Sequence, residues 1–157
     1  MGVQTVRIPV KFLIEYDASY KIACGTFHGA VDDDLLAASY KRMGKAARAH
    51  QPEMAILDFS YVSRFLVSVG MISRLAVSRP NVAEMYPRCV VAPDDVAFGM
   101  SRMFQALSEE KRRNFHVVRS LSEAYEVLGI AQEPDFKIFD TFELPDPPFI
   151  KSRAANS

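Results

Sequence analysis

Three serines and one arginine between residues 58 and 70 are the side chains whose types and spacing come closest to chemistry. Ser60, Ser63 and Ser68 cluster where a strand is expected to end and a helix to start. A serine at a helix N-terminus can carry a phosphate, because the N–H groups there stabilise negative charge. Arg64 can pair with such an anion or with a partner's carboxylate. In the alternative interpretation, Ser60 and Ser63 only cap or brace the turn.

The other side chains capable of catalysis are too scattered to predict an enzyme. His28, His50 and His116 have no metal-ligand spacing with one another or with Cys, Asp or Glu, so we expect no metal. No Gly-x-Ser-x-Gly sequence is present, and a hydrolase with an unrecognised site is the least favoured alternative. The chain also lacks Gly-x-Gly-x-x-Gly and Gly-Lys-Ser/Thr, so we expect no cofactor and no enzymatic activity.

The charge balance argues against nucleic acid as a partner. The chain has 157 residues, enough for one domain, and its 19 Lys and Arg equal its 19 Asp and Glu. Proteins that neutralise phosphates need a local excess of Lys and Arg. The one basic cluster, residues 111–113, directly follows Glu109 and Glu110. We interpret it as a solvated helix end.

Cysteine usage and hydropathy indicate a reduced, cytoplasmic setting. Cys24 and Cys89 are too few for a disulfide framework, and each lies in an apolar run, which predicts buried thiols. Residues 1–12 lack the apolar core of a signal peptide. No apolar run approaches the length of a membrane span, so we expect none.

Alternating or continuous apolar segments predict five strands, at residues 11–16, 20–28, 54–58, 88–92 and 114–119. The first two form a hairpin, and Gly29 is expected to end the second. Apolar spacing and capping residues predict four helices, at 31–49, 65–77, from Asp94 or Asp95 to about 107, and 120–128. The order β-β-α-β-α-β-α-β-α predicts an α/β protein with a mixed five-stranded sheet and helix crossovers. In this scheme residues 58–64 form a polar elbow between strand and helix.

The C-terminal segment differs in composition from the rest of the chain, because it combines several prolines with many Phe and Ile. It is too apolar for an exposed linker. We expect residues 136–144 to be extended and to pack on the body or on a second subunit, and about the last six residues to be disordered. The predicted divisions are a lead-in, 1–10, a folded domain, 11–129, and an extended tail, 130–157.

Two stretches carry a resemblance to a known family. Residues 56–62, Ile-Leu-Asp-Phe-Ser-Tyr-Val, resemble the hydrophobic-Asp-Leu-Ser-Gly-Val strand end of the STAS domain, the fold of bacterial anti-sigma-factor antagonists. Residues 99–105, Gly-Met-Ser-Arg-Met-Phe-Gln, with Ser-Glu-Ala at 122–124, are similar to the SpoIIAA-like branch, small bacterial proteins often left uncharacterised. The resemblance covers about residues 11–129 and implies the STAS scaffold with a protein-docking surface around the elbow.

The resemblance fails at the position that regulates this family. Regulated members carry Asp-Ser-Ser-Gly at the helix start, where this chain has Leu66-Val67-Ser68-Val69-Gly70. Leu66 replaces the Asp and Val67 the phosphorylated Ser, whereas Ser68 lies one place on. Ser68 is therefore the one phosphorylation candidate, and docking is better supported than a kinase-driven switch.

These observations predict a non-enzymatic regulatory or binding module. It would act through protein–protein docking, with a protein partner or as a homodimer, and the candidate residues are Asp58, Ser60, Ser63, Arg64 and Ser68. The alternative is a small apolar-ligand or lipid-binding protein, because many Met and Phe side chains can line a pocket between helices.

Overall fold

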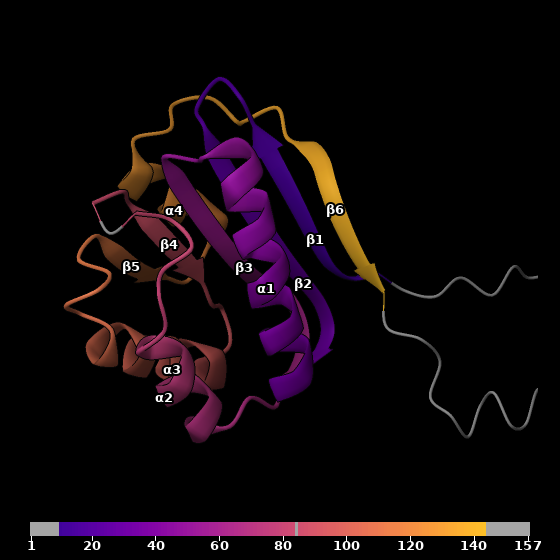
Figure 1. Cartoon of the computed structure of the whole chain (residues 1–157), viewed down its shortest axis with the longest axis vertical. Helices are drawn as coiled ribbons and strands as arrows, with labels where there is room; N and C mark the ends of the chain where they lie inside the picture. Colours follow the sequence, from indigo (N-terminus) through magenta and orange to yellow (C-terminus); the bar gives the residue numbers. More distant parts are fainter. Residues whose placement is uncertain (1–9, 84, 144–157) are drawn as a thin grey trace, which may run out of the picture.

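The fold is a mixed β-sheet with helices on both faces (Figure 1). This computed structural model describes residues 10–83 and 85–143. Within them the strands are β1 Val10–Asp17, β2 Ile22–Val31, β3 Met54–Phe65, β4 Arg88–Val91, β5 Phe115–Val118 and β6 Lys137–Glu143. The helices are α1 Asp33–His50, α2 Val69–Ala76, α3 Asp95–Leu107 and α4 Leu121–Leu128. The predicted α/β class is confirmed, and the last residues, expected to be disordered, lie outside the described part.

The sheet has six strands in the described residues, not the predicted five, in the order β5-β4-β3-β2-β1-β6. Strands β2, β3, β4 and β5 run parallel, and β1 is antiparallel to both β2 and β6. The additional strand is residues 137–143, which pair with β1 along the edge of the sheet. Residues 137–143 are thus extended and pack on the body of the same chain, as expected for this segment. Sequence patterns did not predict that they form a strand of the sheet, because this pairing depends on β1, which is far away in the chain.

Strand β3 does not stop at residue 58, so the prediction of a loop over residues 58–64 is wrong. It continues to Phe65 because β2 also continues beyond Gly29, and the two strands stay paired, with Gly29 opposite Val62 and Val31 opposite Phe65. Gly29 has φ +80° and lies next to a shift in register. It therefore accommodates an irregularity within β2 and does not end the strand, contrary to the prediction.

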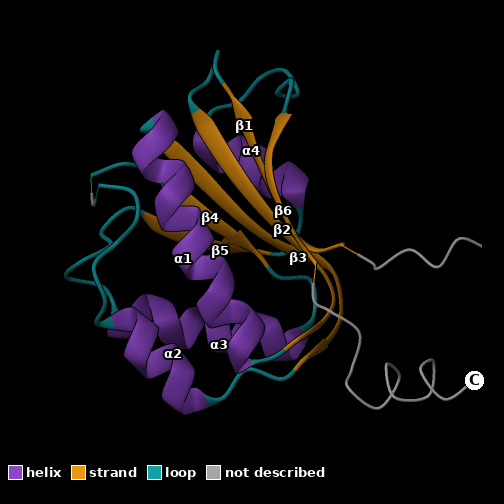
Figure 2. Cartoon of the chain, turned by 45° about the vertical axis from the view of Figure 1, so that its right-hand side comes forward, coloured by secondary structure: helices purple, strands orange, loops and turns teal. Residues whose placement is uncertain are grey.

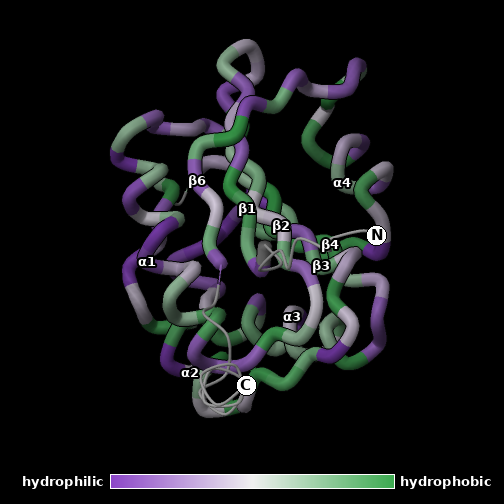
Figure 3. The backbone as a smooth tube through the Cα atoms, turned by 90° about the vertical axis from the view of Figure 1, so that its right-hand side faces the viewer, coloured by the Kyte–Doolittle hydropathy of each residue, from purple (hydrophilic) through white to green (hydrophobic). Residues whose placement is uncertain are grey.

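Helices α1, α2 and α3 lie on one face of the sheet, and α4 lies on the other (Figure 2). The larger core, under α1, α2 and α3, includes Phe12, Phe27 and Leu35. The smaller core, under α4, contains Cys24 and Cys89, which are buried free thiols as predicted. Figure 3 shows hydrophobic residues concentrated along the strands between these layers.

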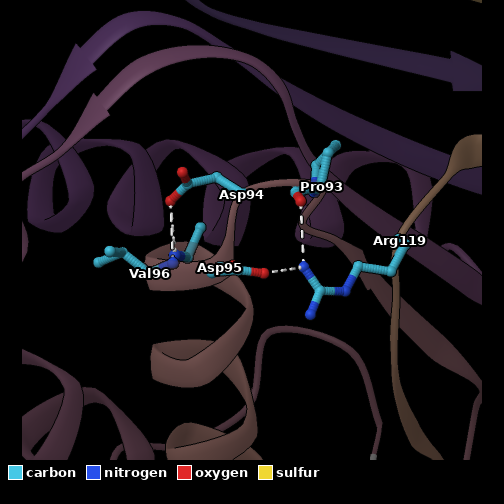
Figure 4. A network of polar contacts seen from close by, with 6 residues as sticks. Pro93, Asp94, Asp95, Val96 and Arg119 are labelled. Carbon is cyan, nitrogen blue, oxygen red and sulfur yellow. Dashed lines mark hydrogen bonds and ion pairs between the residues drawn. The ribbon is translucent and has the colours of Figure 1, made fainter.

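Local capping explains where α3 begins. Asp94 Oδ2 accepts a hydrogen bond from the Val96 N–H at 3.0 Å, so Asp94, one of the two predicted candidates, is the N-cap. Asp95 instead pairs with Arg119, whose Nη1 donates to Asp95 Oδ1 at 2.7 Å and to the Pro93 carbonyl at 3.1 Å (Figure 4). Arg119 thereby joins the loop after β5 to the start of α3.

The capping box expected at the start of α4 from Ser120 and Glu123 forms only in its serine half, because the Glu123 carboxylate accepts from the Arg119 N–H at 3.2 Å instead of from the N–H of the cap residue. The Ser120 Oγ accepts from the Glu123 N–H at 3.1 Å, and Gly129 ends the helix in a left-handed conformation. Helix α2 is shorter than predicted, because it begins at Val69 and not at Phe65. Of the four residues before it, Phe65 ends β3 and Ser68 caps α2.

Candidate functional site

The carboxylate of Asp58 is directed inward and is already bonded. Asp58 is 4% exposed, and its Oδ1 accepts hydrogen bonds from the Ser60 N–H at 2.9 Å and the Ser60 Oγ–H at 2.6 Å. The register between β2 and β3 shifts at this point, so the two bonds stabilise a bulge. The structure brings Asp58 and Ser60 together, but the carboxylate is engaged within the chain.

Ser63 and Arg64 lie in the outer half of β3, with Arg64 opposite Ala30 of β2. Both are exposed, and neither side chain forms a hydrogen bond or ion pair with the described residues. Ser68 is separate from them, at the start of α2. The predicted site residues therefore lie in three places without a shared centre: the bonded pair Asp58 and Ser60, the outer half of β3, and the start of α2.

Ser68 links the starts of two helices. Its Oγ accepts from the Met71 N–H at 3.1 Å, which caps α2, and donates to Asp33 Oδ2 at 2.6 Å. The Ser68 N–H also donates to Asp33 Oδ1 at 2.7 Å. These two bonds lower the pKa of the Asp33 carboxyl from its ordinary value. The hydroxyl thus fastens α2 to the first turn of α1.

Large apolar side chains are exposed beside these residues. Tyr61 is 62% exposed, and Leu66 and Val69 are also exposed. The Tyr61 ring stacks on His28, with ring centroids 5.1 Å apart. We call Tyr61, Leu66 and Val69 the apolar edge; its position follows from the continuation of β3 past residue 58.

An apolar pocket lies between the sheet and α1, α2 and α3. Its volume is about 160 Å³. Almost all of its lining is carbon, contributed by side chains of the larger core and of the helices above it, including Ile14, Leu36, Met43, Leu57, Phe59, Ile72, Leu75, Val90 and Phe104. This pocket combines Phe and Met residues from distant segments.

Arg112 is a buried arginine in the lining of this pocket, and its hydrogen bonds with the described residues all go to neutral oxygens. It is 5% exposed. Its Nη1 donates to the Ala76 carbonyl at 3.1 Å, and its Nη2 donates to the Tyr40 hydroxyl at 2.8 Å and to the Ser78 carbonyl at 3.4 Å. Burial lowers the pKa of the guanidinium, and Tyr40 partly opposes that shift. The interpretation of residues 111–113 as a solvated helix end is therefore wrong for Arg112.

A second, polar pocket adjoins the apolar one. Residues 80–82, in the loop after α2, line both. Three exposed cationic residues complete the polar pocket: Arg48 from the last turn of α1, Arg79 from the loop after α2, and Lys111 from the loop after α3. We call this the basic mouth.

Sequence reasoning missed Arg112 and Tyr40. Arg112 stands between two other cations and after two acids, a pattern typical of a solvated surface. Tyr40 lies within the helix predicted over residues 31–49, and its sequence position gives no sign that its hydroxyl donates to the Arg79 carbonyl at 2.7 Å. No local signal could have found this pair, because Arg112 bonds to Tyr40 of α1 and to carbonyls at the end of α2, both far from it in the chain.

The two cysteine thiols are buried, and the three histidines lie apart from one another. Burial raises the pKa of the Cys24 thiol to about 12 and that of Cys89 to about 11. Each histidine has a described partner other than a serine: His28 stacks on Tyr61, His50 on Tyr16, and His116 bonds to Asn114. Among the described residues, no three His, Cys, Asp or Glu side chains are grouped to hold a metal ion.

No family model matches this chain, and no curated protein matches it. None of the helices in residues 10–83 and 85–143 is long and apolar enough to cross a membrane.

Proposed function

We propose that this protein is a non-enzymatic binding protein, on a STAS-like scaffold, whose ligand is a small apolar molecule. The observation that carries the proposal is the apolar pocket between the sheet and α1, α2 and α3. Cavities of roughly 150 Å³ lined by apolar side chains stay dry and accept a molecule about the size of benzene. Such a ligand gains about 25 cal/mol for each Å² of apolar surface that it buries.

A ligand-observed NMR titration with toluene tests this proposal. Wild type should bind toluene, and Leu75→Trp should weaken binding about tenfold or more, because the larger ring occupies the pocket that Leu75 lines. Leu107→Trp is the matched control, since Leu107 is exposed on α3 and does not line the pocket. If toluene does not bind, or if both variants bind it like wild type, the proposal is wrong.

A second candidate function is self-association through the apolar edge. It is favoured by the exposure of three large apolar side chains, Tyr61, Leu66 and Val69, next to Arg64. Large apolar side chains exposed within a short stretch of the chain are candidates for an interaction site. The resemblance of residues 56–62 to the STAS strand end, if it reflects a shared scaffold, implies docking in the same region. A different protein, in place of a second copy of this chain, would dock on the same surface.

Sedimentation velocity tests self-association. Wild type should sediment as a dimer at micromolar concentration, and Tyr61→Ser combined with Leu66→Ser should produce monomer, because these side chains are already exposed and their loss leaves the fold intact. Leu107→Ser, another exposed leucine, should remain dimeric. If wild type sediments as a monomer, self-association through the apolar edge is ruled out.

A further inference from the structure

The basic mouth and the apolar pocket are neighbours that share one loop. Residues 80–82 line both. Asn81 is fixed there, because its Nδ2 donates to the Tyr40 carbonyl at 3.2 Å. Gly44 permits this approach, since a Cβ at position 44 would lie 2.9 Å from Asn81 Oδ1 and 3.5 Å from the Arg48 guanidinium. The closeness of these atoms places Arg48 beside the loop that separates the two pockets.

The charges of this site are of one sign. None of Arg48, Arg79 and Lys111 forms an ion pair with the described residues, and the described lining of both pockets contains no Asp or Glu. Cations that line a pocket with no carboxylate in its described lining attract an anion. The mouth therefore has the charge expected of an anion-binding surface.

Arg112 extends this positive charge inward. The Tyr40 hydroxyl accepts from Arg112 and donates to the Arg79 carbonyl, so the buried cation is one hydroxyl away from the mouth. A buried charge is normally paired with an opposite charge, because desolvation is costly. Arg112 has only neutral acceptors among the described residues, and these bonds do not use every N–H of its guanidinium.

Capping explains one part of the environment of Arg112. The Ala76 and Ser78 carbonyls lie at the end of α2, where a cation is favourable. Capping does not require a buried residue beside an apolar pocket, nor does it account for the three cations of the basic mouth, which form no ion pair with the described residues. A ligand with a negative head and an apolar body satisfies all of these features together.

We infer that the ligand is an amphipathic anion, with its apolar body in the pocket and its single anionic head group at Arg112 and the basic mouth. This inference rests on the proposed function of the pocket. The volume accommodates a body of roughly six carbons. A carboxylate and a phosphate monoester share the required charge and both form bidentate bonds with arginine.

Isothermal titration calorimetry with four probes of equal tail length tests the inference. Hexanoate and hexyl phosphate carry the anionic head, whereas 1-hexanol is neutral and hexylamine is cationic. We expect at least one of the anions to bind about tenfold or more tightly than 1-hexanol, and hexylamine to bind most weakly. The preference should shrink between low and high salt, because the mouth is exposed.

Charge reversal at the mouth completes the test without disturbing the buried arginine. Arg48→Glu and Arg79→Glu should each weaken anion binding several-fold and leave 1-hexanol binding unchanged. Arg102→Glu is the matched control, because Arg102 is exposed on α3 and lines neither pocket. Stronger binding of hexanoate, of hexyl phosphate, or of both identifies the head group and supports the inference in each case.

Two failures are distinguishable. If 1-hexanol binds as tightly as both anions, the pocket accepts apolar molecules but the inference is overturned. The inference is also overturned if neither arginine reversal changes anion binding. If none of the four probes binds, the proposed function itself fails.

Discussion

At the scale of single residues, the contacts that matter most are polar bonds between segments far apart in the chain. Ser68 joins α2 to Asp33 of α1, and Arg112 joins the end of α2 to Tyr40 of α1. Both serve packing as well as the proposed sites. Their removal should therefore be measurable as a change in stability in the absence of any ligand.

Ser68→Ala should change how stability depends on pH. The folded-state pKa of Asp33 lies below its ordinary value of 3.8 because Ser68 donates to its carboxylate. A lowered folded-state pKa contributes stability that is present above 3.8 and is lost as the pH falls through the folded value. Urea unfolding should show wild type more stable than Ser68→Ala at pH 7, with the difference shrinking below pH 3.8.

Asp33→Asn is the control for this experiment, because it removes the titrating group itself. In that background, the pH dependence of the Ser68→Ala effect should disappear. A difference between wild type and Ser68→Ala that stays constant from pH 7 to below 3.8 would show that the Ser68–Asp33 bond does not stabilise the folded state.

Arg112→Met should destabilise the protein by about 2–4 kcal/mol, because it leaves buried carbonyl and hydroxyl acceptors without their donor. Arg112→Lys should recover only part of this loss, since an ammonium cannot reproduce the planar arrangement of the guanidinium donors. Thermal and urea unfolding measure both. Lys111→Met, at the exposed neighbouring position, should stay within about 0.5 kcal/mol of wild type.

At the scale of elements, the β2–β3 pair and β6 determine the surfaces of the molecule. The continued pairing of β2 and β3 carries Ser63 and Arg64 outward and exposes Tyr61. Strand β6 covers the edge of β1. It is also fastened to α1, because Arg42 Nη1 donates to both carboxylate oxygens of Asp140 at 2.9 Å.

Ending the chain at residue 136 should lower stability by at least about 2 kcal/mol. This truncation removes β6, whose Phe139 and Phe142 pack against the core, and leaves the edge of β1 unpaired. A chain ending at residue 143 retains the whole strand and is the control. Equal midpoints of urea unfolding for the two truncated chains would contradict a stabilising role for β6.

At the scale of the whole molecule, the sheet separates two cores, with the pocket and basic mouth belonging to the side covered by α1, α2 and α3. Helix α4 closes the other side, where both cysteines are buried. The two thiols can therefore report on opening of the folded protein as a unit.

Both thiols should react with a charged disulfide reagent at pH 8 only when the protein opens, since burial holds their pKa values at about 12 and about 11. The reaction rate should be far below that of an unfolded control and should rise with urea in parallel with global unfolding. Rapid modification of either thiol in native buffer would contradict the burial described for Cys24 and Cys89.

The sequence alone was sufficient for the features that depend on neighbours in the chain. Asp94 and Ser120 cap helices through bonds to N–H groups two or three residues away, and apolar periodicity is a property of a single segment. The α/β class, the first hairpin and both buried cysteines followed from such patterns. The residues of the candidate docking site could also be named from the sequence, because serines and an arginine cluster between residues 58 and 70.

Only the tertiary structure decided the extent of β3, the sixth strand and the burial of Arg112. Strand β3 continues because β2 remains beside it, β6 exists through its pairing with β1, and Arg112 is buried by Tyr40 and the end of α2. Each depends on contacts between segments separated by at least about thirty residues, whose energy no local pattern records. The serines of the predicted elbow were placed apart for the same reason, and a pocket with a cationic mouth took their place as the leading site.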